Sequence, residues 1–177
     1  MPYAGVLPFA VDENGSIWVL LGQEHASGNE RASLRWSDFG GHIDRGETPL
    51  QAAAREAFEE SMGLLGSAHD IERQLIAQRA PQVRTRDKRG VHFLLCIALD
   101  HTIVRAFNAF RYYANMSSVA GNAPLPAMNK GFWEKVRAGW FPLHALESSV
   151  SLRYEFLLDF VALRAALQRA AQRARRQ

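Results

Sequence analysis

Cysteine is nearly absent from this sequence: Cys96 is the only one among 177 residues. A single thiol excludes an intrachain disulfide bond, and it also excludes a metal site built from several cysteines. The residues on either side, Leu95 and Ile97, are apolar. We therefore expect Cys96 to be a thiol of the hydrophobic core and not a catalytic nucleophile.

Long apolar runs are also missing. No segment is apolar enough over a sufficient length to cross a bilayer, and the first residues, MPYAGVLPFA, lack the basic region and long apolar stretch of a secretory signal. The net charge of +3 is small for this length, so it does not by itself indicate a nucleic-acid partner. These absences predict a cytoplasmic protein with no membrane partner.

No internal repeat and no linker divides the chain, and 47% of its residues are hydrophobic, enough for a substantial core. We expect residues 1–177 to form one domain. An amphipathic helix at about 151–175 is predicted to close it, because apolar residues recur there at helical spacing: Leu152, Phe156, Phe160, Leu163 and Leu167.

The most informative stretch runs from position 41 to position 63. Thr48, Pro49 and Gln51 have the composition of a capping box with proline at the first helical position, so a helix is predicted to begin at about Thr48. Apolar residues then recur every three or four positions and form a stripe that would pack on a sheet: Leu50, Ala53, Ala54, Ala57, Phe58 and Met62.

Three carboxylates occupy another face of this helix. Glu56, Glu59 and Glu60 stand at i, i+3 and i+4, so their side chains are neighbours and repel one another. Arg55 neutralises part of this negative charge, and a hard divalent cation such as Mg²⁺ or Mn²⁺ would neutralise the rest. A solvated acidic face would look the same, so the triplet alone does not decide between the two interpretations.

The spacing to the preceding residues is more specific. Gly41 is followed after five residues by Glu47, and seven residues later comes Arg55-Glu56, with Glu59-Glu60 completing the pattern. This arrangement resembles the signature of the Nudix hydrolases. The family pattern places its last glycine at position 62, whereas this chain has Gly63, which predicts one extra residue before the helix stops.

The resemblance implies a fold and a reaction class. The implied fold is α/β, a Nudix-type α/β/α sandwich with a mixed β-sheet and a loop-helix-loop catalytic motif. The implied reaction is hydrolysis of a diphosphate linkage in a nucleoside diphosphate joined to another group, with Mg²⁺ or Mn²⁺ as cofactor. Many relatives are dimers, so a homodimer is compatible with the resemblance.

The resemblance also assigns roles to residues. Glu56, Glu59 and Glu60 become candidates for metal binding and water activation, and Gly41 would offer a carbonyl to the metal. Arg55 and Glu47 would brace the loop. Candidate residues also include Glu134, because in some relatives an acidic residue at a comparable place binds metal or acts as a base. Its basic neighbours suit a surface ion pair equally well.

The rest of the chain is predicted from periodicity and turn residues. In chain order we expect a hairpin of Ala4–Val11 and Ile17–Gly22, a short strand at Leu34–Gly40, a second hairpin of Ile71–Arg79 and Val91–Leu99, a helix at His101–Tyr113, a long loop at Ala114–Asn129, and a strand ending at Pro142.

Four arginines are candidates for binding substrate phosphates. Arg31 and Arg35 lie in or beside a polar loop, and Arg84 and Arg86 lie in the tip of the second hairpin. Each also suits a solvated surface position. Aromatic residues that would stack a base or simply fill the core are Phe107, Phe110, Tyr112, Tyr113 and Trp133.

Two classes of function remain open. The first is a Mg²⁺-dependent diphosphohydrolase, favoured because the acidic triplet is intact; the second is a non-catalytic Nudix domain that binds nucleotide or RNA as a sensor. For the enzyme, the substrate would be a nucleotide-type small molecule or the 5′ end of RNA. The small-molecule candidates are nucleoside triphosphates, nucleotide sugars, ADP-ribose and dinucleoside polyphosphates. The basic hairpin tip favours RNA without deciding it.

Overall fold

The computed structural model describes residues 2–25, 33–119 and 130–175, with side chains described throughout except at 116–119 and 130. Within these ranges no helix is long and apolar enough to span a membrane. The 26–32 loop, which carries the predicted substrate-binding residue Arg31, lies outside the described residues, as does the 120–129 part of the predicted long loop.

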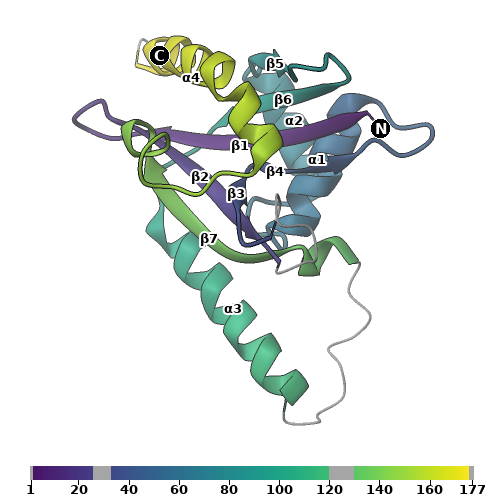
Figure 1. The fold of residues 1–177 in the computed structure, drawn as a ribbon. Helices are drawn as coiled ribbons and strands as arrows, with labels where there is room; N and C mark the ends of the chain where they lie inside the picture. The colour runs from purple at the N-terminus through teal and green to yellow at the C-terminus, as the bar shows by residue number, and fades with distance from the viewer. Residues whose placement is uncertain (1, 26–32, 120–129, 176–177) are drawn as a thin grey trace.

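A mixed sheet forms the centre of the molecule (Figure 1). Its strands are β1 (Tyr3–Val11), β2 (Ile17–Glu24), β3 (Trp36–Ser37), β4 (Phe39–His42), β5 (Gln82–Arg84), β6 (Gly90–Cys96) and β7 (Lys135–Pro142). The strand order is β3-β2-β1-β6-β5, with β4 paired to β1 and β7 paired to β2. Only β1 and β6 run parallel, and the other pairs are antiparallel.

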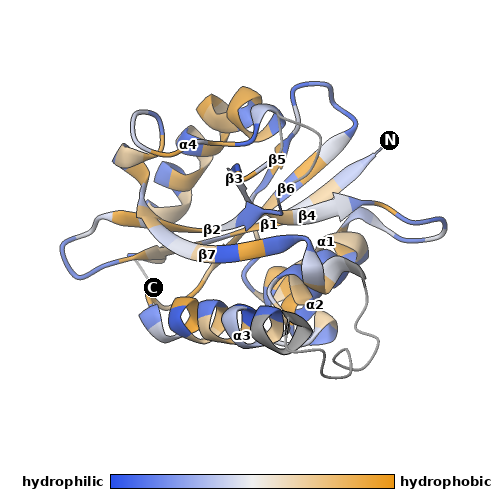
Figure 2. Ribbon diagram, turned by 60° about the horizontal axis from the view of Figure 1, so that its bottom comes forward, coloured by the Kyte–Doolittle hydropathy of each residue, from blue (hydrophilic) through white to orange (hydrophobic). Residues whose placement is uncertain are grey.

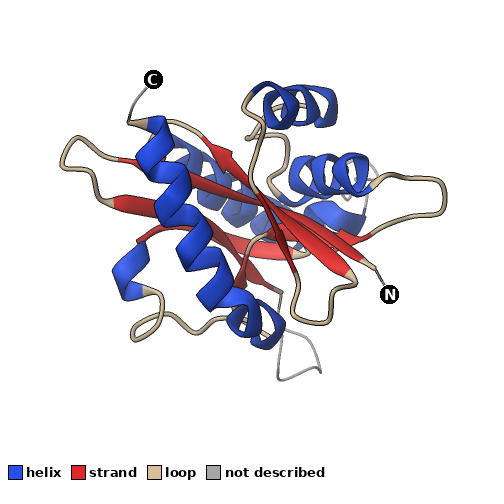
Figure 3. Ribbon diagram, turned by 90° about the horizontal axis from the view of Figure 1, so that it is seen from above, coloured by secondary structure: helices blue, strands red, loops and turns tan. Residues whose placement is uncertain are grey.

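Helices cover both faces of this sheet (Figure 2). On one side lie α1 (Pro49–Glu60), α2 (Ala68–Ala77) and α3 (His101–Val119), and on the other α4 (Tyr154–Ala174) crosses the strands (Figure 3). The short 3₁₀ helices are η1 (Lys130–Trp133) and η2 (Leu143–Ala145). The predicted α/β sandwich with a mixed sheet is therefore confirmed.

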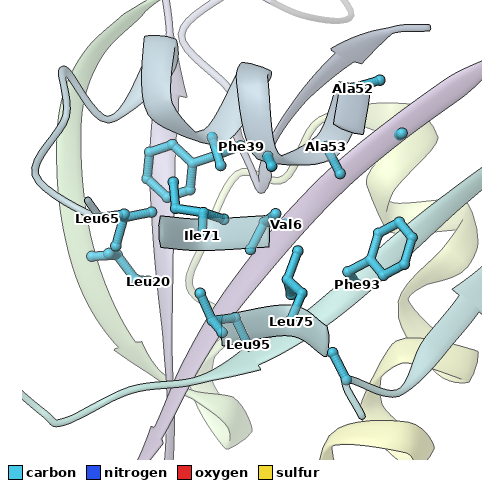
Figure 4. Packing of buried hydrophobic residues seen from close by; sticks show 14 of the residues in the cluster. Val6, Leu20, Phe39, Ala52, Ala53, Leu65, Ile71, Leu75, Phe93 and Leu95 are labelled. Carbon is cyan, nitrogen blue, oxygen red and sulfur yellow. The ribbon is translucent and has the colours of Figure 1, made fainter. Parts of the chain in front are cut away.

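Two hydrophobic clusters separate these layers, because successive strand residues point to opposite faces. In β1, Val6 faces α1 and α2, and Leu7 faces α4. Figure 4 shows the first cluster, in which Phe39, Ile71 and Leu75 pack together from a strand and a helix. The apolar residues of α4 lie in the second cluster, so this helix packs on the second face of the sheet.

One prediction was wrong: residues 71–79 do not form a strand. They belong largely to α2, which begins after Ser67, whose hydroxyl accepts a hydrogen bond from the Asp70 amide. The buried residues of the helix, Ile71 and Leu75, are four positions apart, and Ile76 is 60% exposed. The helical period and the N-cap prevailed over an apparent alternation, so β6 pairs with β5 instead.

Two smaller differences concern loops. The predicted strand at 34–40 is two short strands, β3 and β4, which pair with different neighbours and are separated by Asp38. The helix predicted at His101–Tyr113 extends to Val119, so the first part of the predicted loop is helical. The Asn108 amide of α3 bonds both the N–H and the carbonyl of Ala138, which attaches this helix to β7.

Candidate active site

The acidic helix α1 begins where the sequence predicts. The Thr48 hydroxyl accepts a hydrogen bond from the Gln51 amide, and the Gln51 side chain accepts one from the Thr48 amide, so the capping box is complete. Ala53 and Ala57 are fully buried and face the sheet. At the other end the prediction of Gly63 as the helix stop was wrong. Met62 follows the Ser61 cap and takes the left-handed position with a φ of 56°, at the place where the family pattern has glycine, and Gly63 comes after it with a φ of 76°.

Three carboxylates of α1 are withdrawn from solvent. Glu56 is 8% exposed, Glu59 is 7% and Glu60 is 1%. Two glycines leave the space for them: a methyl group on Gly41 would lie 2.6 Å from the Glu56 carboxylate, and one on Gly131 would lie 2.5 Å from Glu59 Oε2. The backbone of β4 therefore lies directly against the acidic face of the helix.

Arg55 joins the loop to the first two carboxylates. Its Nε donates to Glu47 Oε1 at 2.7 Å, and its Nη2 donates to Glu47 Oε2 at 3.0 Å. Its Nη1 donates to Glu56 at 2.8 Å and lies 3.5 Å from Glu59. The structure thus brings the predicted pair Arg55 and Glu47 together, with one guanidinium facing several carboxylates.

Glu60 has a separate set of partners. Its Oε2 accepts a hydrogen bond from the Gly40 amide at 2.7 Å, and its Oε1 lies 3.5 Å from Lys135 Nζ. Burial raises the pKa of Glu60 well above its ordinary value, and Lys135 opposes that rise.

The charge at the other two carboxylates is also incompletely balanced. Burial raises the pKa of Glu56 and of Glu59, and Arg55 only partly opposes it. Glu134 adds its charge, which raises the pKa of all three α1 glutamates. This predicted residue is exposed and lies between η1 and β7, so the structure brings it to the acidic cluster.

This donor set fits a hard divalent cation. Buried carboxylates that repel one another gain most from a cation whose preferred ligands are oxygen atoms. Among the described residues no three side chains are already gathered into a metal cage. Mg²⁺ does not require such a cage, because it usually binds one or two carboxylates and completes its shell with waters and substrate phosphates.

A cavity of about 270 Å³ lies on the opposite, α4 side of the sheet. Its lining includes Ser37, Asp38 and His42, which flank the two glycines of β4. Arg86 and Arg89 from the β5–β6 hairpin also line it, beside the acidic residues Asp87 and Glu155. The cavity therefore adjoins the backbone that contacts the acidic helix.

A buried chain of hydrogen bonds forms the wall of this cavity. The Tyr3 hydroxyl donates to Asp38 at 2.7 Å, His92 Nδ1 lies 2.7 Å from Asp38, and His92 Nε2 lies 3.0 Å from Asp159. Burial alone would lower the pKa of His92, but the two aspartates raise it to about 9. The protonated imidazole thus joins β6 to α4 and to the residue before β4.

Comparison with known proteins decides the family. The family model for the NUDIX domain matches residues 1–160 of this chain. The chain belongs to the Nudix family. This Nudix hydrolase is therefore a pyrophosphohydrolase that cleaves diphosphate linkages, as the motif predicted, and enzymes of the family generally use divalent metal ions.

Named relatives agree with this assignment. An RNA pyrophosphohydrolase from Bartonella quintana is 31% identical over 161 residues, which cover 85% of this chain and 82% of the relative. An RNA pyrophosphohydrolase from Rhizobium meliloti is 29% identical over 159 residues, covering 84% and 83%. Both are enzymes, which favours the hydrolase over a non-catalytic sensor.

Solved structures support the fold. The crystal structure of a Nudix hydrolase from M. smegmatis matches with a TM-score of 0.52 and 18% identity, covering 95% of this chain and 86% of that one.

The predicted substrate-binding arginines of this Nudix hydrolase do not form one group. Arg86 lines the cavity, whereas Arg84 is exposed on β5 and is not part of the lining. Arg35 is exposed and donates to the Ser151 hydroxyl. The structure thus brings one of the four predicted arginines to the cavity and places two elsewhere, with Arg31 undescribed.

The aromatic candidates also divide. Phe107 is a core residue, whereas Tyr112 and Tyr113 are exposed on α3. Trp133 lies under the Arg111 guanidinium, whose carbon is 4.8 Å from the ring centre. None of these residues lines the cavity, so the sequence did not identify a base-stacking partner there.

Sequence reasoning missed two kinds of residue in this Nudix hydrolase. Asp38 lies outside the motif, which begins at Gly41, and it was not identified, although it contacts both Tyr3 and His92 in the buried network. Nothing in the local sequence distinguished His92 or Lys135, because their partners come from distant segments.

Proposed function

We propose that this Nudix hydrolase removes pyrophosphate from the 5′ end of RNA, with Mg²⁺ or Mn²⁺ as its cofactor. The observation that carries the proposal is the likeness to two RNA pyrophosphohydrolases over more than four fifths of each chain. The cavity beside β4 supports it, because its mixed lining includes arginines, whose guanidinium groups bind phosphates well.

The residues that would hold the cation are Glu56, Glu59 and Glu60, together with the carbonyl oxygen of Gly41. A divalent ion bound there would neutralise phosphate charge and lower the pKa of the attacking water.

The chain's own residues have positioning and proton-transfer roles in this proposal. Arg55 holds Glu56 and Glu59 by direct contacts and ties them to the loop through Glu47. The exposed Glu134 carboxylate faces the same cluster and would accept the proton of the attacking water.

The cavity would receive the first part of the RNA chain. Sequence-tolerant binding of an RNA end needs phosphate contacts and room for an unstacked base. Arg86 and Arg89 would supply the phosphate contacts, and the cavity of about 270 Å³ would leave room for a single base.

The test compares substrates and variants in one assay. Wild type is incubated with a 5′-triphosphorylated oligonucleotide, ATP, ADP-ribose and a dinucleoside tetraphosphate, with and without Mg²⁺, and products are separated. We expect pyrophosphate and 5′-monophosphorylated RNA as the dominant products, formed only with the metal. Glu60→Gln should abolish this release, whereas Glu13→Gln, an exposed glutamate in the β1–β2 turn, should retain it.

The possible outcomes test the substrate assignment and the assignment of the acidic cluster separately. A larger kcat/KM for any of the small nucleotides than for the RNA would refute the RNA assignment. Metal-independent release, or equal release by Glu60→Gln, would refute the assignment of the acidic cluster. Arg86→Ala should raise KM for the RNA and leave KM for ATP unchanged.

A further inference from the structure

Lys135 is a fully buried lysine, with 0% of its surface exposed, at the start of β7. Lysine is almost never buried to this extent unless its ammonium is paired. Here Nζ lies 2.7 Å from Glu24 Oε1 and donates to the Ser37 hydroxyl at 2.8 Å. Its third polar neighbour is Glu60 Oε1 at 3.5 Å. One ammonium thus contacts α1, β2 and β3 together.

Glu24 has polar partners other than Lys135. The Ser37 hydroxyl donates to Glu24 at 2.8 Å, and Arg153 Nη1 lies 3.3 Å from the same carboxylate. Glu60 has fewer charged partners. Among the residues described by the structure, Lys135 is the cation within ion-pair distance of its carboxylate. Removal of Lys135 therefore changes the surroundings of Glu60 more than those of Glu24.

The two contacts of Glu60 set the plane of its carboxylate. The Gly40 amide of β4 donates a hydrogen bond to Oε2 at 2.7 Å, and the Lys135 ammonium of β7 attracts Oε1 as an ion pair at 3.5 Å. The terminal torsion of a glutamate is broad and intrinsically permissive, so a single contact would leave the carboxylate free to rotate. A hydrogen bond to one oxygen and an ion pair to the other, from two different strands, together favour one orientation.

We infer that Lys135 is a positioning residue, whose buried ammonium fixes the Glu60 carboxylate in the orientation that the hydrolytic reaction requires. This inference rests on the proposed role of Glu60 in the metal site. Lys135 touches neither substrate nor reacting atoms; it acts through Glu60.

Gly22 provides a way to move the ammonium without removing its charge. A methyl group on Gly22 would lie 2.8 Å from Cδ and 2.9 Å from Cγ of Lys135, too close for either atom to stay in place. Gly22→Ala therefore displaces the lysine stem. Gly139→Ala is a matched control on the adjacent strand, because its methyl group would meet Phe141 and Trp36 but not Lys135.

The experiment measures kcat, KM and one signal that requires no metal. Lys135→Met, Gly22→Ala, Gly139→Ala and wild type are compared with the preferred diphosphate substrate. In metal-free protein, the amide proton shift of Gly40 reports the hydrogen bond to Glu60, because a short charge-assisted bond moves that resonance downfield.

We expect Lys135→Met and Gly22→Ala to lower kcat by about 100-fold with KM little changed, since small displacements of reacting groups have effects of this size. In both variants the Gly40 resonance should move upfield, and Gly139→Ala should change neither quantity. Wild-type kcat and an unshifted Gly40 resonance in folded Gly22→Ala would overturn the inference, even if Lys135→Met fails to fold.

Failure of the proposed function would look different. If wild type releases no product from any diphosphate substrate, the kinetic result refutes the proposed reaction and carries no information about Lys135. The Gly40 resonance then still decides whether Lys135 orients Glu60: an upfield shift in Gly22→Ala supports the positioning contact, and an unchanged shift refutes it.

Discussion

Raising the pH from 6.5 to 9 should remove about 3 kcal/mol of folding stability that His92 contributes. The imidazole is 2% exposed and lies between Asp38 and Asp159, which come from the β3–β4 junction and from α4. In the folded protein its pKa is raised from 6.5 to about 9, because the two carboxylates favour its charged form more than burial disfavours it.

The sign follows from proton binding. Below pH 6.5 the imidazole is protonated in both the folded and the unfolded chain, so the full stabilisation is present. Between 6.5 and 9 only the folded chain retains the proton, so each pH unit costs about 1.4 kcal/mol. Above about 9 both states are neutral and this contribution is gone.

The assay is urea unfolding of wild type at pH 6, 7, 8 and 9, repeated for His92→Gln and for His69→Gln. His69 is an exposed histidine on α2 and serves as the matched control. The quantity of interest is the difference in unfolding free energy between wild type and each variant as a function of pH. For His92→Gln this difference should shrink by about 3 kcal/mol from pH 6.5 to 9, and for His69→Gln it should stay constant.

A difference that stays constant across this range for His92→Gln would refute the charged, doubly paired histidine. A difference that grows with pH would show that the buried imidazole is neutral in the folded protein, which reverses the assigned sign.

Three further predictions concern stability near the site. Leu163→Ala in α4 should lower the unfolding free energy by about 2–5 kcal/mol, because Leu163 is fully buried. Val161→Ala, at a position 77% exposed, should change it by less than about 0.5 kcal/mol. Equal changes for the two variants in urea titrations would contradict the assigned helix face. Thr48→Ala should cost about 1 kcal/mol through loss of the N-cap, and unchanged thermal unfolding would argue against it. Arg55→Met should cost about 1–3 kcal/mol, because it removes the guanidinium that donates to the buried Glu56 and leaves Glu47 with the Asp44 amide as its donor. A variant as stable as wild type in chemical denaturation would exclude the bracing contact.

The motif and its helix were predictable because they depend on local rules. A capping box and a helical period each involve residues within a few positions of one another. The same rules place the carboxylates of Glu56, Glu59 and Glu60 on one face before any tertiary contact forms. The segment 71–79 was mispredicted because its few apolar residues suit two periods; the Ser67 N-cap and packing on the sheet select the helix.

The acidic helix, the order of most elements and the family of the chain can be predicted from the residues alone. Only the folded chain shows which charges meet: Lys135 lies near Glu60, and His92 joins Asp38 to Asp159. An ion pair carries no periodic signal along the chain. Its partners are brought together by strand pairing and helix packing, and their burial then sets both the pKa of each group and its dependence on the other.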